Sequence, residues 1–329
     1  MAGQERILRR RIKSMQSTKK ITRAMELIAA TRIVKAQARV ASARPYADQI
    51  TAVIRSLAAG GAAAGQPLLT SKTSVRKVGY IVMAGDRGLA GAYNSSVIRL
   101  AERAALAGRA QGIDFGLITV GKKVEDYFKF RKYAIDAAFK GFTDSPTYEN
   151  ARAVAAEVLK RFESGEYDQI ELVYTQFLSA GSQRAVLRRF APVDLGDSVD
   201  RPASAGDTGG GASSGYEFEP EPASILASLL PRYAESRLFA AMLDAAASEH
   251  AARQRAMKSA TDNAGELIKK LAREMNQARQ AAITTEIMEI VSGAEALAED
   301  SREPGDLLLD RSTGVGDLFR NRVDQQLAS

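Results

Sequence analysis

The sequence predicts an α/β protein with a long antiparallel coiled coil formed by its N- and C-terminal helices. Residues 1–57 and 225–297 have the composition and apolar spacing of very long, Ala-rich helices, whereas the stretch between them alternates strand-like and helical segments. At a rise of about 1.5 Å per residue, the two helices would reach roughly 85 and 110 Å. Helices of that length cannot be buried in one compact domain, so we expect each to cover the apolar stripe of the other.

The N-terminal helix is assigned to residues 1–59. Apolar residues fall at Ile21, Met25 and Ile28, and a seam with alternating steps of four and three follows, as in a coiled coil. Pro45 lies within this helix, where a kink is favoured. The seam consists of Ala36, Val40, Ala43, Ala47, Ile50, Ile54 and Leu57.

The central domain, residues 60–195, has a different period. Strand-like, β-branched runs alternate with helical segments, which predicts a mostly parallel, Rossmann-like sheet covered on both faces, with residues 185–190 as an edge strand. Ser145 is placed as the N-cap of the last of these helices, with Pro146 as its first residue. The strand-like runs are residues 78–83, 115–120 and 170–177, and the helical segments lie near 95–106, 122–130 and 147–162.

The remaining chain divides into three segments. Residues 196–221 form a Gly/Ser-rich stretch that predicts a flexible insert followed by a foot segment. Residues 222–297 form the second coiled-coil helix, in which Pro231 either makes a kink or marks the true start. Residues 298–329 lose the apolar pattern and are expected to be a mobile tail.

Composition excludes several classes of chemistry. Cysteine is absent, so disulfides, thiol catalysis and Cys-ligated zinc are excluded. The single histidine, His250, leaves no histidine cluster and is expected at a surface or an interface. No apolar run approaches the roughly 18 residues that span a bilayer, and no signal peptide is indicated. We therefore expect a soluble protein made in the cytoplasm.

Positive charge is concentrated in the first helix. Residues 1–60 carry a net charge of +10 within a chain of net charge +7, so the remainder is slightly acidic. A basic helix can bind nucleic acid, an anionic membrane or an acidic protein surface, and composition does not choose among these.

Two stretches imitate nucleotide-binding motifs. Residues 116–123 match GxxxxGK, but Lys123 stands where Ser or Thr should bind Mg²⁺, and the intervening residues predict a strand. The glycines of residues 85–91 follow a strand and precede a helix, yet their spacing differs from GxGxxG and favours a structural turn; an anion site or a partner-binding loop is the alternative. The carboxylates of Glu217 and Glu219 lie beside the insert and do not suggest a dry catalytic pocket.

Three long motifs carry a resemblance to a known family. The sequence KKITRAMELIAA (residues 19–30) closely resembles the N-terminal signature of the γ subunit of F-type ATP synthases. The sequences AMKSATDNAG (256–265) and ARQAAITTEIMEI (278–290) resemble its C-terminal signature, and GDRGLAGAYN (85–94) resembles its Gly-rich loop. Their order and spacing also match, up to about residue 297.

The resemblance implies a rotor shaft without catalytic residues or bound cofactors of its own. In the family, proton flow through a membrane ring of c subunits turns the shaft inside a hexamer of α and β subunits, which bind ATP, ADP and Mg. Partners would be the α, β, ε and c subunits, with the chain peripheral at the cytoplasmic face of a bacterial cell membrane. The competing interpretation is a basic coiled coil that binds nucleic acid.

The resemblance also implies three sets of contact residues. The first would meet the α and β stator subunits, the second the apical bearing, and the third the c ring and ε at the foot. The stator set is Lys19, Lys20, Arg23, Met25, Arg279, Gln280, Thr284 and Glu286; the bearing set is Ile287, Ile290 and Val291; the foot set is Tyr216, Phe218 and Glu219.

Overall fold

The computed structural model describes residues 2–58, 66–70, 72, 74–193 and 221–300. The expected insert and foot segment at 196–220 and the tail beyond residue 300 lie outside the described residues. The chain divides into two compact units, one of Gln16–Gly265 and one of Met1–Met15 with Glu266–Ser329.

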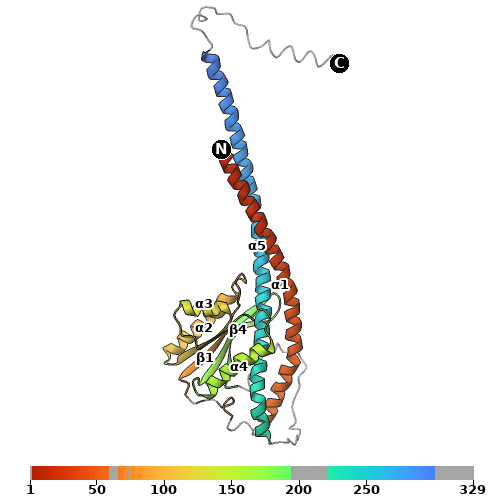
Figure 1. The fold of residues 1–329 in the computed structure, drawn as a ribbon, viewed down its shortest axis with the longest axis vertical. Helices are drawn as coiled ribbons and strands as arrows, with labels where there is room; N and C mark the ends of the chain where they lie inside the picture. Colours follow the sequence, from red (N-terminus) through yellow and green to blue (C-terminus); the bar gives the residue numbers. More distant parts are fainter. Residues whose placement is uncertain (1, 59–65, 71, 73, 194–220, 301–329) are drawn as a thin grey trace, which may run out of the picture. The chain divides into compact units, whose positions relative to one another are not determined.

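The two terminal helices are each continuous. Helix α1 spans Ala2–Leu57 and helix α5 spans Pro222–Asp300 (Figure 1). Within the unit Gln16–Gly265 they run antiparallel, because Thr22 contacts Thr261 while Ile54 shares a core cluster with Leu226. The predicted coiled-coil pairing of the chain ends is therefore confirmed in this unit.

Proline ends neither long helix. Pro45 lies inside α1 and Pro231 lies inside α5. Because α5 begins at Pro222, the idea that Pro231 marks its true start is wrong. Proline at position 222 is compatible with a first helical turn, where the missing N–H has no intrahelical partner.

The central sheet has five strands in the order β3-β2-β1-β4-β5. Strands β1 (Lys77–Met83), β2 (Asp114–Val120), β3 (Ala137–Phe139) and β4 (Gln169–Phe177) are parallel, and β5 (Gln183–Ala191) pairs antiparallel with β4 at the edge. The mostly parallel sheet and its additional edge strand are as predicted. Strand β3 was not predicted, because three residues at a sheet edge carry too short a pattern to be recognised.

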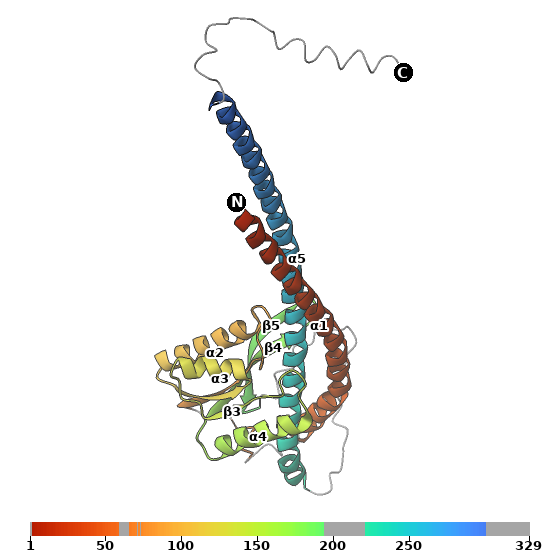
Figure 2. The same ribbon diagram turned by 45° about the horizontal axis from the view of Figure 1, so that its top comes forward.

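Helices cover both faces of the sheet (Figure 2). Helices α2 (Tyr93–Ala110) and α3 (Lys122–Phe130) pack on one face, where Tyr80 and Val82 are buried. Helix α4 (Tyr148–Glu163) and parts of α1 and α5 pack on the other face, which buries Ile81. Alternate residues of β1 thus face two separate cores, as expected for a buried parallel strand.

The cap of α4 differs from the prediction. Thr147 is the N-cap: its hydroxyl accepts from the Asn150 backbone N–H, and the Asn150 side chain accepts from the Thr147 N–H. Ser145 instead closes a turn by donating its N–H to the Phe142 carbonyl at 3.1 Å. A reciprocal capping box satisfies two helix-end groups at once, which a Ser-Pro start cannot do.

Candidate partner-binding surfaces

Two opposite faces of helix α1 differ in exposure over residues 21–34. One is buried inside the unit and is formed by Thr22, Glu26, Ala29 and Ile33 at helical spacing. At about 100° per residue, a second set lies on the opposite side of the helix. This exposed stripe consists of Ile21, Leu27, Ile28 and Val34, whose side chains are 55–66% exposed.

The buried face is fixed by hydrogen bonds between and within the helices. The Thr261 hydroxyl of α5 donates to Thr22 Oγ1 of α1 at 2.8 Å, and Thr22 donates to the Lys19 carbonyl at 3.1 Å. These contacts turn Thr22 toward α5 and Ile21 and Ile28 away from it. The apolar residues Ile21 and Ile28 of the N-terminal motif therefore lie outside the coiled-coil seam.

The four predicted stator-contact residues of α1 lie around the exposed stripe. Lys19, Lys20 and Arg23 are exposed, and Met25 is half-buried. Arg23 forms an ion pair with Glu26 on its own helix, with 2.8 Å between Nη1 and Oε1. Part of its charge is thereby compensated. Lys19 Nζ lies 3.1 Å from the position of a Cβ at Gly265 of α5, so Lys20 carries the positive charge beside the stripe.

The other predicted contact residues on α5 belong to the second unit. Arg279, Gln280, Thr284 and Glu286 are all exposed, and the Thr284 hydroxyl donates to the Gln280 carbonyl at 2.9 Å. The three predicted bearing residues are also exposed, by 53–67%; they are Ile287, Ile290 and Val291. An exposed row of large apolar residues on a helix is typical of a protein-interaction surface.

The Gly-rich loop is held in place as a structural turn. The Asp86 carboxylate accepts from the backbone N–H groups of Lys122, Gly141 and Thr143 at 2.9–3.1 Å. Burial alone would raise the pKa of this carboxyl, but these donors outweigh it and lower the pKa. The loop is thus bound to the segments that follow β2 and β3.

The same loop is also fastened to α5. A Cβ at Gly85 would lie 2.9 Å from Glu249 Cδ, and the Gly88 carbonyl accepts from Arg253 at 3.4 Å. Glu249 and Arg253 form a buried ion pair at 2.5 Å. At the tip, Leu89 is exposed and has a φ of 61°. Gly85 therefore permits the close approach of the loop to α5, while Leu89 is exposed at its tip.

The second motif with nucleotide-like spacing lies in a strand. Residues 116–120 belong to β2, and Gly121 has a φ of 110° with the Ala84 carbonyl 2.1 Å from the position of a Cβ. The predicted strand is confirmed. A strand cannot provide the converging N–H groups of a phosphate-binding loop.

His250 is deeply buried, so its expected surface location is wrong. It is 2% exposed, and Nε2 donates to the Asp144 carbonyl at 3.0 Å. Burial is the main cause that lowers the pKa of this imidazole. His250 does lie at an interface within the chain, because it links α5 to the loop that precedes α4.

The charged contact residues expected from the sequence stay a prediction, and the exposed stripe of α1 was not predicted as a surface. The signal was present, because four large apolar residues fall on one helical face between positions 21 and 34. The foot residues Tyr216, Phe218 and Glu219 lie outside the described residues. Within the described part of the chain, no cluster of three metal-ligating side chains occurs and no helix is long and apolar enough to span a bilayer.

Comparison with known sequences gives consistent matches. The family model described as ATP synthase matches residues 4–297. The chain is 49% identical over 302 residues to the ATP synthase gamma chain of Kineococcus radiotolerans, covering 91% of this chain and 98% of that relative. It is 46% identical over 312 residues to the ATP synthase gamma chain of Mycolicibacterium smegmatis, covering 91% and 99%.

Solved structures show the same fold. A chain of the Euglena gracilis mitochondrial ATP synthase (OSCP/F1/c-ring) matches with a TM-score of 0.65 and 17% identity, covering 94% of this chain and 100% of that one. A chain of the Tetrahymena thermophila mitochondrial ATP synthase (central stalk and c ring) matches with a TM-score of 0.56 and 24% identity, covering 73% and 99%.

Proposed function

The chain belongs to the family of ATP synthase gamma chains, and on that premise we propose how its surfaces act in a rotary complex. The observation that best supports this proposal is the 49% identity to a gamma chain over 91% of this chain. The chain is the central rotor shaft that couples proton flow through the membrane c ring to ATP synthesis or hydrolysis at the α/β hexamer. Catalytic sites lie on the β subunits, and the shaft acts mechanically.

The exposed stripe of α1 is proposed as the stator-facing surface of this helix. Its apolar side chains Ile21, Leu27 and Ile28 are 55–61% exposed, and Lys20 adds positive charge beside them. A surface of this kind suits acidic, partly apolar lever segments of β. Exposed ion pairs are worth only about 0–1 kcal/mol each, so the contact can be made and broken at every step of rotation.

Met25 and Arg23 are proposed to adjust this contact. The thioether of Met25 lies at the border between the buried and exposed faces, where an adaptable side chain can follow a changing partner surface. Arg23 can exchange its pairing with Glu26 for a carboxylate of the stator. These roles are supported by exposure and by position on the helix.

The end of α5 is proposed as the apical part of the shaft. Arg279, Gln280, Thr284 and Glu286 would meet surrounding loops of α and β. Ile287, Ile290 and Val291 would supply the apolar bearing surface, as their exposure supports. Apolar contacts lack directional bonds, so they allow one surface to slide over another.

Further partners follow from the same proposal. The segment with Tyr216, Phe218 and Glu219 would contact ε and the c ring, and the sheet domain would form the base of the rotor. Nucleotides and Mg would bind to α and β, with no cofactor on this chain. The complex would place the chain at the cytoplasmic face of a bacterial membrane, as a peripheral subunit.

Reconstitution tests the proposal directly. The full chain is mixed with purified α and β subunits, and the recovered complex is assayed for ATP hydrolysis and for rotation of a bead attached to the shaft. We expect a stable complex with stepwise, ATP-driven rotation. Failure to assemble, combined with recovery of nucleic acid that is lost steeply with salt, would favour the nucleic-acid alternative, which the comparisons do not support.

A further inference from the structure

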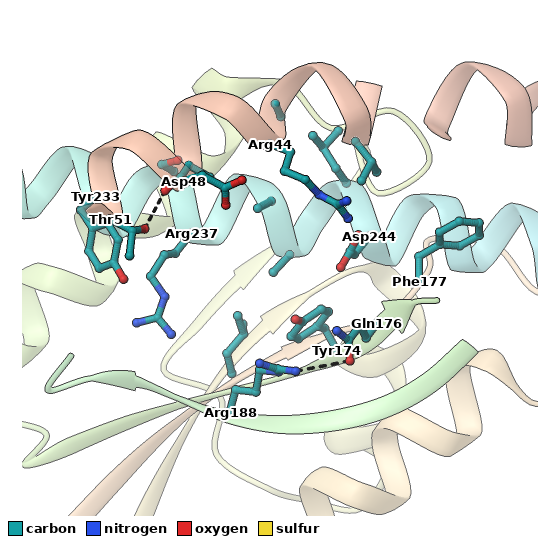
Figure 3. A pocket seen from close by; sticks show the side chains of 18 residues that line it. Arg44, Asp48, Thr51, Tyr174, Gln176, Phe177, Arg188, Tyr233, Arg237 and Asp244 are labelled. Atoms are coloured by element: carbon teal, nitrogen blue, oxygen red, sulfur yellow. Dashed lines mark hydrogen bonds between the residues drawn. The ribbon is translucent and has the colours of Figure 1, made fainter. Parts of the chain in front are cut away.

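Helix α1 is loosely packed over its middle part. No residue of this helix from 34 to 49 is buried, whereas Ile33 before this stretch and Ile50 after it are buried. A cavity of about 200 Å³ lies between this part of α1 and the elements β4, β5 and α5 (Figure 3). In Figure 3, Arg44 extends from α1 across this space toward Asp244 of α5. Close packing therefore holds α1 at the two ends of the stretch.

Two arginines link this part of α1 to the loop between β3 and α4. We call residues 141–146 the bridging loop. Arg32 forms an ion pair with Asp144, with 2.9 Å between Nη1 and Oδ2. Arg39 donates to the Ser145 hydroxyl at 3.2 Å and to the backbone carbonyl of the residue that follows. These contacts connect α1 to the sheet domain within and beside the stretch where its packing is loose.

The bridging loop is bound to α5 through the same aspartate. The Asp144 carbonyl accepts from His250 Nε2 at 3.0 Å, and His250 is buried. Asp144 thus contacts α1 with its side chain and α5 with its backbone. A hydrogen bond of a buried side chain is costly to break, because the freed group is left without water. Asp144 therefore fixes the bridging loop to both long helices at one point.

The start of the bridging loop is anchored just beyond the end of β1. The Asp86 carboxylate accepts from the Gly141 N–H at 2.9 Å, from the Thr143 N–H at 3.1 Å and from the Thr143 hydroxyl at 2.9 Å. The Asp86 N–H in turn donates to Thr143 Oγ1 at 2.9 Å. Because a well-satisfied polar network is rigid, a displacement of the sheet is passed on to this loop.

We propose that the bridging loop carries rotation between α1 and the sheet domain, with Asp144 as the positioning residue that sets the angle of this helix. The inference rests on the rotor function proposed above. A force on the exposed stripe of α1 reaches the loop through Arg32 and Arg39, and it reaches the sheet through Asp86. A single exposed ion pair adds little to folding stability. Its effect here is on the stiffness of the joint between helix and sheet.

Helix α5 depends less on the bridging loop, because it has further links to the sheet. The Ser248 hydroxyl donates to the Thr175 carbonyl of β4 at 3.1 Å. The Arg237 guanidinium donates to two carbonyls of β5, those of Arg189 at 3.0 Å and Phe190 at 3.3 Å. Loosening the bridging loop should therefore free α1 and leave α5 attached.

Single-molecule rotation of the complex with α and β subunits tests the proposal. A bead is attached to the sheet domain through Ala107→Cys, at an exposed position of α2 in a chain that has no native cysteine. The α and β subunits are fixed to a surface. The angular fluctuation of the bead is recorded during the pauses between steps, and its variance measures how loosely the sheet domain is joined to the stator-bound helices.

The variants remove one or both links of α1. Arg32→Gln removes the ion pair, and Arg32→Gln/Arg39→Gln removes both links. Asp144→Ala removes the carboxylate but keeps the carbonyl that is bonded to His250. Arg32→Lys is the conservative variant, because it retains the charge. Lys35→Gln, at another exposed cation of α1, is the matched control for lost charge.

We expect Arg32→Gln/Arg39→Gln to raise the angular variance at least twofold, with Lys35→Gln unchanged. Arg32→Gln and Asp144→Ala should give smaller, equal increases, and their combination should add nothing, because the two residues form one link. Arg32→Lys should stay close to the unmodified chain. If the double arginine variant melts early, the comparison of Arg32→Gln with Arg32→Lys decides instead.

An unchanged variance in the arginine variants would overturn the proposal, as would additive effects of Arg32→Gln and Asp144→Ala. The rotor function is checked separately by ATP-driven rotation of the complex that contains the unmodified chain. Absence of that rotation would refute the rotor function itself. Normal rotation with equal fluctuation in all variants would remove only the role of the bridging loop.

Discussion

The hydroxyl of Thr261 on α5 lies 2.8 Å from the hydroxyl of Thr22 on α1, and both residues are buried. This hydrogen bond joins residues 239 positions apart in the sequence. It sets which face of α1 is turned toward α5. The exposed apolar stripe on the opposite side is a consequence of this choice.

Replacing Thr261 by Val should therefore destabilise the unit. The substitution keeps the shape but leaves Thr22 without its donor, so we expect a loss of about 1 kcal/mol in the free energy of unfolding, measured by urea titration of the full chain. The double variant Thr22→Val/Thr261→Val should recover most of the loss, because neither partner is then left unpaired. Thr31→Val is the control, since that hydroxyl is exposed and donates only to Leu27 of its own helix. Additive losses in the double variant would contradict this account.

Polar substitution on the stripe should weaken assembly and leave folding intact. Leu27→Gln and Ile28→Gln replace apolar side chains that are more than half exposed. We expect normal melting of the isolated chain and at least a tenfold loss in affinity for the α and β subunits, measured by pull-down at graded concentrations. Leu106→Gln, at an exposed position of α2, is the matched control. Equal behaviour of all three variants would remove the stripe from the interface.

Much of the architecture was predictable because its signals are long or local. Helices α1 and α5 carry many periodic residues, and the β-branched runs of β1, β2 and β4 are distinct. The orientation of α1 could not be predicted from the apolar pattern, because its buried face contains the polar residues Thr22 and Glu26 while Ile21 and Ile28 are exposed. The burial of His250 was not predicted for a similar reason, because its hydrogen-bond partner, the Asp144 carbonyl, lies 106 residues away in the sequence.

The buried carboxylate of Asp168 should make the sheet domain sensitive to acid. It accepts from Lys72 Nζ at 2.7 Å and from the backbone N–H groups of Arg76 and Lys77. The Lys72 hydrogen bond is the main cause that lowers the pKa of this carboxyl to about 2. Because the folded pKa is depressed, the stabilisation is complete above about pH 4, the ordinary value for Asp. It is then lost as the pH falls toward 2.

Asp168→Asn should lower stability at pH 7 by about 1–3 kcal/mol and flatten this part of the pH profile. Denaturant unfolding between pH 2.5 and 7 provides the measurement. Asp114→Asn, at an exposed residue of β2, should leave the profile unchanged. A slope between pH 4 and 2.5 that is identical in Asp168→Asn and in the unmodified chain would refute the assignment.

Two glycines of one loop should differ in their tolerance of alanine. A Cβ at Gly85 would meet the Glu249 carboxyl at 2.9 Å, and this side chain cannot easily move because it is buried and paired with Arg253. At Gly88 the nearest atom is Lys123 Cε, at 3.9 Å. We expect Gly85→Ala to cost about 1–3 kcal/mol, with Gly88→Ala close to neutral. Hydrogen exchange of the loop should increase only in Gly85→Ala, and a reversed order of stability would contradict the close approach.

The apolar row at the end of α5 should matter for rotation and hardly at all for folding. Ile287 and Ile290 are exposed in their own unit, so replacing them by Gln removes no internal packing. Glutamine keeps helix propensity high, and we expect unchanged melting of the chain. In the assembled complex the double variant should lose apolar contact with the bearing and hydrolyse ATP with less proton pumping per ATP. Proton pumping into membrane vesicles, measured beside ATP hydrolysis, gives this ratio. Ser292→Gln, on the same helix, controls for the added amide, and an unchanged ratio in the double variant would show that the bearing does not use these residues.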